Sequence, residues 1–232
     1  MAWTYEDISN TVRNLCSMQD NTQLTDVKLL ARANRYYQEQ FPKDVRPLQL
    51  KSWYDLTLVD GTDTYDLKKD FYDKNVKIDP MAYISETSGY KETLLNVYYS
   101  VGNFYDVWVE NADYTSTSYK GQPADVLLYN NELLFRKCPD GTYYVSFKCM
   151  RKPLVYNSAG TTSSNAFEAD TDIPEQPEWG KLIAYGTAVD ILTEMGNISD
   201  LQVVTNLYQE ELTKVSSQDL NWFSQTRAIP RF

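Results

Sequence analysis

Residues 173–196 read IPEQPEWGKLIAYGTAVDILTEMG and give the strongest helix signal in the chain. Pro177 suits the first turn of a helix, apolar residues then recur at helical spacing, and Gly196 suits the position that ends one. The signal follows a long strand-like stretch (residues 50–150), and more helix is predicted near the N-terminus. We therefore expect the two helical ends of the chain to meet across a β-rich insertion.

The N-terminal segment predicts two helices. Thr4 is expected to cap the first, over residues 5–16, and Asp7 to complete a capping box. Thr25 is expected to cap the second helix, and Pro42 to end it. The predicted apolar face of the second helix contains Val27, Leu30, Ala31, Asn34, Tyr37 and Phe41.

Between residues 50 and 155 the apolar pattern changes to a period of two, which is typical of strands. Asp60-Gly61 predicts a hairpin turn, and Asn130-Asn131 predicts another because both residues tolerate positive φ. The regular turns favour an antiparallel sandwich or a small barrel-like sheet. The predicted strands are residues 53–59, 62–67, 76–87, 91–99, 104–109, 125–129, 132–136 and 143–150.

At the C-terminal end, Ser199 is expected to cap a last helix whose apolar pattern fails after residue 216. The remaining residues carry large apolar side chains without periodicity, which is unusual for a disordered end. We predict an arm that orders on a partner; the alternative is that it folds back on its own domain. The predicted docking residues are Trp222, Phe223, Arg227, Ile229, Arg231 and Phe232.

The predicted fold class is α+β. It is a helical bundle made from N-terminal and C-terminal helix pairs, with a large antiparallel β-sandwich-like insertion and an extended C-terminal arm. The expected parts are a helical part (1–47), a β-rich insertion (48–155), a polar loop anchored by Phe167 (156–176), a second helical part (177–216) and the arm (217–232).

The composition excludes several kinds of chemistry. The 232 residues contain no histidine, which removes serine–histidine catalysis and imidazole metal sites. The three cysteines are far apart and are expected to be reduced and buried. The acidic run DGTDTYD (60–66) lacks calcium-loop spacing and predicts a solvated hairpin tip. We predict no catalytic residue, no metal site and no cofactor, and we expect that the protein is not an enzyme.

The net charge of −10 disfavours tight binding of DNA, although an acidic wall lets a duplex slide past. No stretch approaches the roughly 18 apolar residues of a membrane span. The N-terminus also lacks the apolar region of a secretory signal, so we expect synthesis in a cytoplasm and no membrane partner.

Two further groups of residues are candidate contact sites. Small residues at Gly186 and Ala188 predict a close helix or subunit contact, together with Trp179, Leu182, Ile183, Val189 and Leu192. The β region offers aromatic side chains that suit a protein interface or a sugar-binding platform. The alternative is that these aromatics alternate between the core and the edge of a sheet. They are Tyr98, Tyr99, Tyr105 and Trp108, with Phe104 between them.

The order of parts resembles the head–tail connector (adaptor or head-completion) proteins of tailed bacteriophages. Three stretches carry the resemblance: GTDTYDLKKDF (61–71), GQPADVLLYNNELLFRKCPDGTYYVSFKCMRKP (121–153) and IPEQPEWGKLIAYGTAVDIL (173–192). The N-terminal EDISNTVRNL and LLARANRYYQEQF are also similar to the short helix pair of that family. Lys68 departs from the family's usual proline, and residues 72–119 match no part of the pattern.

The resemblance implies a subunit of a ring, commonly twelvefold, that lies below the portal at the capsid vertex and extends the DNA channel. It implies that the C-terminal arm docks on the portal protein, that copies of the chain neighbour one another, and that the β part meets tail or further neck proteins. DNA would pass through without specific binding. The protein would be located in the virion, at the portal vertex or neck.

Two other function classes stay open from the residues alone. One is a β-sandwich that binds carbohydrate or another surface through the aromatic residues of 98–108. The other is a hydrolase that uses paired carboxylates, but no pair stands out among the 32 acidic residues.

Overall fold

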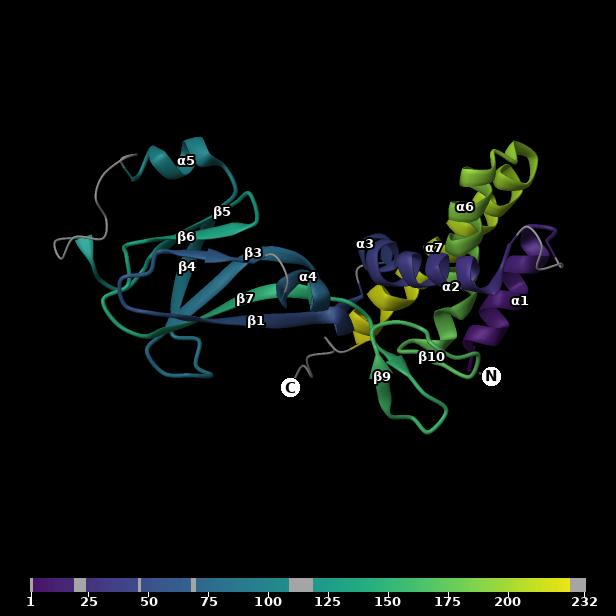
Figure 1. The fold of residues 1–232 in the computed structure, drawn as a ribbon, viewed down its shortest axis with the longest axis horizontal. Coiled ribbons are helices and arrows are strands. Elements are labelled where there is room, and N and C mark those ends of the chain that lie inside the picture. The colour runs from purple at the N-terminus through teal and green to yellow at the C-terminus, as the bar shows by residue number, and fades with distance from the viewer. Residues whose placement is uncertain (1, 19–23, 46, 68–69, 109–118, 226–232) are drawn as a thin grey trace, which may run out of the picture. The chain divides into compact units, whose positions relative to one another are not determined.

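The structure is a computed structural model of the chain and describes residues 2–18, 24–45, 47–67, 70–108 and 119–225 (Figure 1). It has mixed α+β character. The chain divides into two compact units, one formed by Met1–Leu50 with Lys152–Phe232 and one formed by Lys51–Arg151. We call them the helical unit and the β unit. The two ends of the sequence therefore fold together, and the β unit is inserted between them.

The helical unit is organised around α6, which contacts α1, α2, the π-helical turn η1 and α7. A small three-stranded sheet, in the order β10-β8-β9, completes the unit. Its elements are α1 (Tyr5–Leu15), α2 (Asp26–Arg35), η1 (Tyr36–Gln40), α3 (Phe41–Val45), the 3₁₀ turns η2 (Leu48–Leu50) and η4 (Pro177–Trp179), β8 (Val155–Tyr156), β9 (Thr162–Ser164), β10 (Ile173–Pro174), α6 (Gly180–Met195) and α7 (Ile198–Gln225).

The helix signals at three ends are confirmed. The Thr4 hydroxyl accepts a hydrogen bond from the Asp7 backbone N–H at 3.3 Å, and the Asp7 carboxylate accepts one from the Thr4 N–H at 3.0 Å, which makes the capping box of α1. The Thr25 hydroxyl caps α2. Gly196 ends α6 with a φ of 68°, a conformation that glycine adopts without steric cost.

The prediction that Pro42 ends the second helix is wrong. A π-helical turn, η1, precedes Pro42 and passes the chain into α3. In this wider turn the Phe41 N–H donates to the Tyr36 carbonyl. The helical path therefore continues through Pro42, although proline has no N–H to donate. The predicted apolar face is also shifted: Leu29 and Ala33 are buried, whereas Val27 is 78% exposed.

The last helix differs from the prediction at both ends. Its cap is Asn197, whose side-chain oxygen accepts from the Asp200 N–H, and not Ser199. Helix α7 also continues through residues 217–225, so an extended arm from residue 217 is wrong for that stretch. No glycine or proline interrupts residues 198–225, which explains why the helix continues where the apolar pattern weakens.

The segment expected to be a polar loop contains β9 and is held to the helices. Phe167 is buried as predicted, with its ring 5.3 Å from that of Tyr5 and 5.0 Å from that of Tyr37. The Asn34 side chain donates to the Phe167 carbonyl and accepts from the Phe167 N–H. The buried Asp172 carboxylate accepts two backbone N–H groups of the same segment.

The β unit is built on one curled seven-stranded sheet in the order β1-β7-β3-β4-β5-β6-β2 (Figure 1). Two short helices accompany it. The elements are β1 (Lys51–Leu58), β2 (Thr64–Asp66), α4 (Asp70–Lys74), β3 (Asn75–Ser85), β4 (Thr93–Tyr98), α5 (Val101–Tyr105), β5 (Asp125–Tyr129), β6 (Glu132–Arg136) and β7 (Tyr143–Arg151).

The strand pairing corrects the predicted topology in three places. Strands β1 and β2 do not form a hairpin at Asp60-Gly61, because β1 pairs with β7 and β2 pairs with β6. Strands β4 and β5 pair in parallel, so the sheet is not wholly antiparallel. Residues 104–108 do not form the predicted strand, since α5 begins at Val101 with the Ser100 hydroxyl as its cap, and residue 109 of that prediction lies outside the described residues.

The inner face of the curled sheet holds the core of the β unit. Alternate residues of β7 point into it, as the pattern of this strand predicts. Strand β1 at one edge and the central strands contribute large buried side chains, and Phe135 and Phe147 lie 6.5 Å apart there. The core residues include Leu58, Phe71, Ile84, Leu95, Val126, Leu133, Phe135, Val145, Phe147 and Cys149.

The turn between β5 and β6 is the predicted type, with φ values of 52° at Asn130 and 63° at Asn131. Asn130 is exposed, so its backbone conformation is its main structural role. We expect Asn130→Ala to destabilise the β unit by about 1 kcal/mol, because alanine is strained in the left-handed region. Asn130→Gly is the matched control and should keep or raise stability. Urea unfolding of both variants tests this, and equal stability of the two would contradict it.

Candidate functional site

Helix α6 is buried on nearly every side, and most of the contact residues predicted on it are interior residues of the same chain. Leu182, Ile183, Gly186 and Ala188 are all buried in the helical unit. Trp179 and Leu192 are buried too, and Val189 is partly buried against the same core. These residues therefore pack helices of the chain against each other. Within the described residues of the helical unit, exposed surface lies mainly on α1, α2, α7 and the C-terminal end of α6.

Gly186 lies directly against the ring of Tyr36, which belongs to η1. A Cβ built on Gly186 would overlap the outer atoms of that ring. The Tyr36 hydroxyl donates to the Tyr208 hydroxyl at 3.2 Å, and the Tyr208 hydroxyl donates to the Asp44 carboxylate at 2.7 Å. This chain of hydrogen bonds joins η1, α7 and α3 across the face of α6 that Gly186 leaves open.

Burial is the main reason why the pKa values of Tyr36 and Tyr208 lie well above the ordinary 10.0 of a phenol, and the Asp44 carboxylate raises both further. Burial also raises the pKa of Cys16 and of Cys149 to about 11. Both thiols are thus protonated near neutral pH, which makes them weak nucleophiles. The hydroxyl chain is therefore suited to holding helices together rather than to proton transfer near pH 7.

An ion-pair network joins α2 to α6. Arg32 pairs with Glu194 and, at 3.3 Å, with Asp190; Arg35 lies 3.6 Å from Asp190. The spacing of these residues, three or four along each helix, places them on facing sides. Sequence reasoning missed this network, although the spacing of Lys28, Arg32 and Arg35 was a signal for it.

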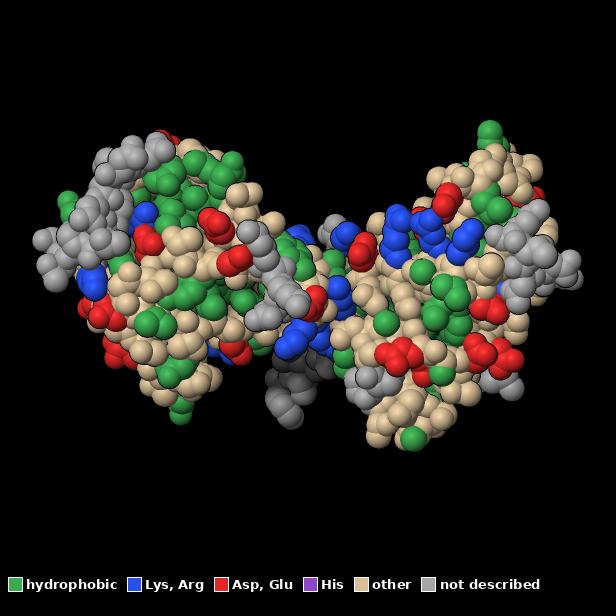
Figure 2. Space-filling model, in the orientation of Figure 1, with side chains coloured by type: hydrophobic (Ala, Val, Ile, Leu, Met, Phe, Trp, Pro, Cys, Tyr) green, Lys and Arg blue, Asp and Glu red, His purple; other side chains and the backbone are tan. Residues whose placement is uncertain are grey.

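Beside this network, a groove of about 450 Å³ lies between α2 and α6. Its lining combines apolar side chains with three basic ones and the carboxylate of Glu194. Figure 2 shows Lys and Arg side chains gathered along this side of the helical unit. The lining residues are Leu24, Lys28, Ala31, Arg32, Arg35, Ile191, Glu194 and Met195.

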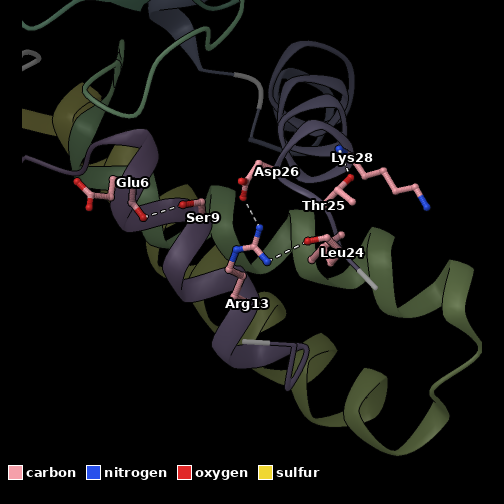
Figure 3. Close-up of polar contacts among 7 residues, drawn as sticks. All are labelled: Glu6, Ser9, Arg13, Leu24, Thr25, Asp26 and Lys28. Atoms are coloured by element: carbon pink, nitrogen blue, oxygen red, sulfur yellow. Dashed lines mark hydrogen bonds and ion pairs between the residues drawn. The ribbon is translucent and has the colours of Figure 1, made fainter. Parts of the chain in front are cut away.

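Arg13 fixes the start of α2 to α1 (Figure 3). Its guanidinium donates to the Leu24 carbonyl at 2.9 Å and to the Asp26 carboxylate at 2.5 Å. The Arg13 side chain is 12% exposed and the Asp26 side chain 77% exposed, so the ion pair is open to solvent on its carboxylate side. Lys28 points away from the clamp, toward solvent (Figure 3).

The aromatic residues predicted as a β-region surface do not form one flat platform. Phe104 of α5 is fully buried, with its ring 5.5 Å from those of both Tyr98 and Tyr105. The Trp108 indole N–H donates to the buried Asp125 carboxylate at 3.3 Å, and the Asn96 amide donates to the same carboxylate at 3.0 Å. These contacts seat α5 on the outer face of β4 and β5.

Among the residues predicted for that surface, Tyr98, Tyr105 and Trp108 are partly buried, and Tyr99 is 48% exposed. Asp125 is the member that sequence reasoning missed. Its position at the start of a strand gave no hint that the side chains of Asn96 and Trp108 would both donate to it.

Two carboxylates of the acidic run at 60–66 form ion pairs with basic residues. Lys120 lies 2.7 Å from Asp60, and Arg136 lies 2.5 Å from Asp63. Within the described residues, no group of three or more cysteine or acidic side chains has the arrangement of a metal site. No described helix is both long and apolar enough to cross a membrane.

The predicted docking residues at the C-terminus fall in two places. Trp222 and Phe223 belong to α7, and the directions of their side chains are outside what the structure describes. Arg227, Ile229, Arg231 and Phe232 lie outside the described residues. Comparison with models of known protein families and with curated proteins found no match.

We expect Gly186→Ala to destabilise the helical unit by about 1–3 kcal/mol, because the added methyl group has to displace the pinned Tyr36 ring. Thermal or urea unfolding measures the loss. Gly141→Ala is the matched control, since a Cβ there meets no atom within 4 Å. The double variant Gly186→Ala/Tyr36→Leu should lose less stability than the two single changes added together. Strict additivity would contradict the proposed contact.

The two buried phenols predict a loss of stability at high pH. A phenol whose pKa is raised in the folded state contributes stability that is fully present below pH 10 and lost above it, because the unfolded chain ionises first. The difference in unfolding free energy between the wild type and Tyr36→Phe/Tyr208→Phe should be constant below pH 10. It should then shrink by up to about 1.4 kcal/mol per pH unit for each phenol.

Urea unfolding at a series of pH values measures that difference. Tyr90→Phe, at a side chain that is 62% exposed, is the matched control. A difference that stays constant to about pH 12 would show that the two phenols are accessible to water in the folded chain.

Proposed function

We propose that this chain is a structural virion protein without enzymatic activity, a subunit of a ring that joins the portal vertex of the capsid to the tail and extends the DNA channel. The observation that carries the proposal is the inserted architecture. Both ends of the chain fold into one helical unit, and residues 51–151 form a separate β unit between them. This order of parts is the one on which the resemblance to head–tail connectors rests.

The build of the helical unit supports the proposal. Helix α6 is buried over most of its length and is tied to α2 by ion pairs, while the Tyr36–Tyr208–Asp44 hydrogen bonds join η1, α7 and α3 beside it, which makes a rigid body suited to a static assembly. In this proposal α1, α2, α6 and α7 act as a four-helix bundle, and the β unit, like a sandwich domain, meets tail or neck proteins. Neighbouring copies, commonly twelve, complete the ring.

The end of α7 supports the proposed contact with the portal. The last buried residue described on this helix is Val215, and the helix continues to Gln225. The sequence beyond Val215 is rich in large apolar residues, including Trp222, Phe223 and Phe232. Aromatic side chains of this kind contribute strongly to protein interfaces when a partner buries them. We propose that residues 217–232 dock on the portal as a helix followed by a short tail.

The charge of the chain supports passage of DNA without binding. Its net charge is −10. Acidic residues outnumber basic ones both in the β unit (51–151) and in the C-terminal segment of the helical unit (152–232). Such a surface gains little from counterion release. The carbohydrate-binding alternative loses its main support, since Phe104 and Trp108 pack onto the sheet and do not form an open array.

We expect the purified chain to add a symmetric layer to rings of the portal protein encoded in the same genome, seen by negative-stain electron microscopy. A chain that lacks residues 226–232 should keep its circular dichroism spectrum and its unfolding midpoint, because the described core ends before residue 226. It should nevertheless decorate portal rings far less often.

A variant with Tyr90→Ala, which alters an exposed aromatic of the β unit, is the control for the truncation. It should decorate portal rings as the wild type does. Bare portal rings beside the free wild-type chain would contradict the proposed function. Normal decoration by the truncated chain would contradict the docking role of the tail.

A further inference from the structure

The helical unit carries two surfaces of opposite charge. One is the basic groove between α2 and α6, defined by the lining residues given above. The other we call the acidic surface, and it consists of four exposed side chains from two segments of the chain. They are Glu6, Glu168, Asp170 and Glu178.

Backbone hydrogen bonds bring the two segments of the acidic surface together. The Glu6 N–H donates to the Asp170 carbonyl at 3.0 Å, and the Trp3 N–H donates to the Pro177 carbonyl at 3.4 Å. Four carboxylates that come from residues far apart in the sequence are thus held on one side of the unit. Figure 2 shows acidic side chains gathered there, near β10 and the start of α1.

The basic groove has charge that its own acidic residues leave unbalanced. Arg32 holds Asp190 and Glu194, but Lys28 forms no ion pair with a described residue, and Arg35 is 51% exposed with a single contact at 3.6 Å. Its lining includes the apolar residues Ile191, which is buried, and Met195, which is 44% exposed. The groove therefore combines apolar surface with cations, which suits an acidic protein surface.

The two surfaces face in different directions. In Figure 3 the Glu6 side chain, at the start of α1, and the Lys28 side chain, at the start of α2, point away from each other, with the Arg13 clamp between them. Figure 2 shows the Lys and Arg row and the acidic side chains at opposite sides of the helical unit. The acidic surface of one copy cannot reach the basic groove of the same copy, but the acidic surface of a second copy can.

We propose that the basic groove receives the acidic surface of a second copy of this chain. Because the two surfaces differ, the contact is head-to-tail, and each added copy presents a new groove and a new acidic surface. Such contacts generate a ring when the rotation closes. The proposal rests on the proposed function for ring closure alone; the contact itself follows from the charges of the helical unit.

Charge reversal tests the contact on the full chain without the portal. The first variant is Lys28→Glu/Arg35→Glu, which makes the groove acidic. Glutamate at position 28 suits the third residue of a helix capped by Thr25, so this change does not weaken α2. The second variant is Glu168→Lys/Asp170→Lys, which makes the acidic surface basic. The matched control is Lys74→Glu/Lys77→Glu, at two exposed lysines of the β unit.

Sedimentation velocity over a range of concentrations measures self-association. The wild type should associate, and each reversed variant alone should do so at least about tenfold more weakly, because like charges then face each other. An equal mixture of the two reversed variants should recover association, since each groove then meets a surface of opposite charge. The control should associate as the wild type does.

Three results would overturn the proposal: a wild type that is monomeric at every concentration, a mixture that fails to recover association, or a control that loses it equally. Decoration of portal rings is a separate measurement. Decoration without the charge dependence would leave the proposed function standing and remove this contact. The charge dependence without decoration would keep the contact and remove the proposed function.

Discussion

Helix α6 buries most of its side chains, and the chain covers them with segments from both of its ends. Helix α1, α2 and η1 come from the N-terminal segment, and α7 from the C-terminal one. Gly186 permits the closest of these approaches, because the Tyr36 ring occupies the space that a side chain would fill. The hydrogen bonds from Tyr36 to Tyr208 and from Tyr208 to Asp44 then join α7 and α3 to η1 beside Gly186. The inserted position of the β unit is a consequence of this shared core.

The β unit buries its apolar side chains in a core of its own. Its sheet curls around one core, so the inner face is covered without a second sheet. The outer face of β4 and β5 is covered by α5, and the buried Asp125 carboxylate accepts hydrogen bonds from Trp108 and Asn96 there. A buried carboxylate is costly unless it is hydrogen-bonded in this way. The same contacts remove Phe104 from the surface and partly bury Trp108.

Electrostatics divides the helical unit into parts with different roles. Ion pairs between α2 and α6 consume two acidic residues, and the Arg13 clamp consumes another. The remaining basic residues of α2 stand out on a chain of net charge −10. The acidic surface, which carries the opposite charge, lies on the other side of the unit. A ring needs two different surfaces on each copy, and this distribution of charge provides a pair.

The sequence by itself determined the local features. Short-range side-chain-to-backbone bonds decide the caps at Thr4 and Thr25. A positive φ, which glycine and asparagine tolerate, decides the stop at Gly196 and the turn at Asn130-Asn131. Each was predictable from a few neighbouring residues. The mixed α+β class and the buried Phe167 followed from periodicity and apolar character.

Tertiary structure alone decided the pairing of β1 with β7 and of β2 with β6, the parallel pair β4–β5, and the helical state of residues 101–105. A strand's pattern states which face is buried but not which strand lies beside it. The π-helical turn before Pro42, the Asp125 cluster and the ion pairs of α2 with α6 likewise arise from contacts between residues far apart in the chain. Their free energy exists only once the chain has folded.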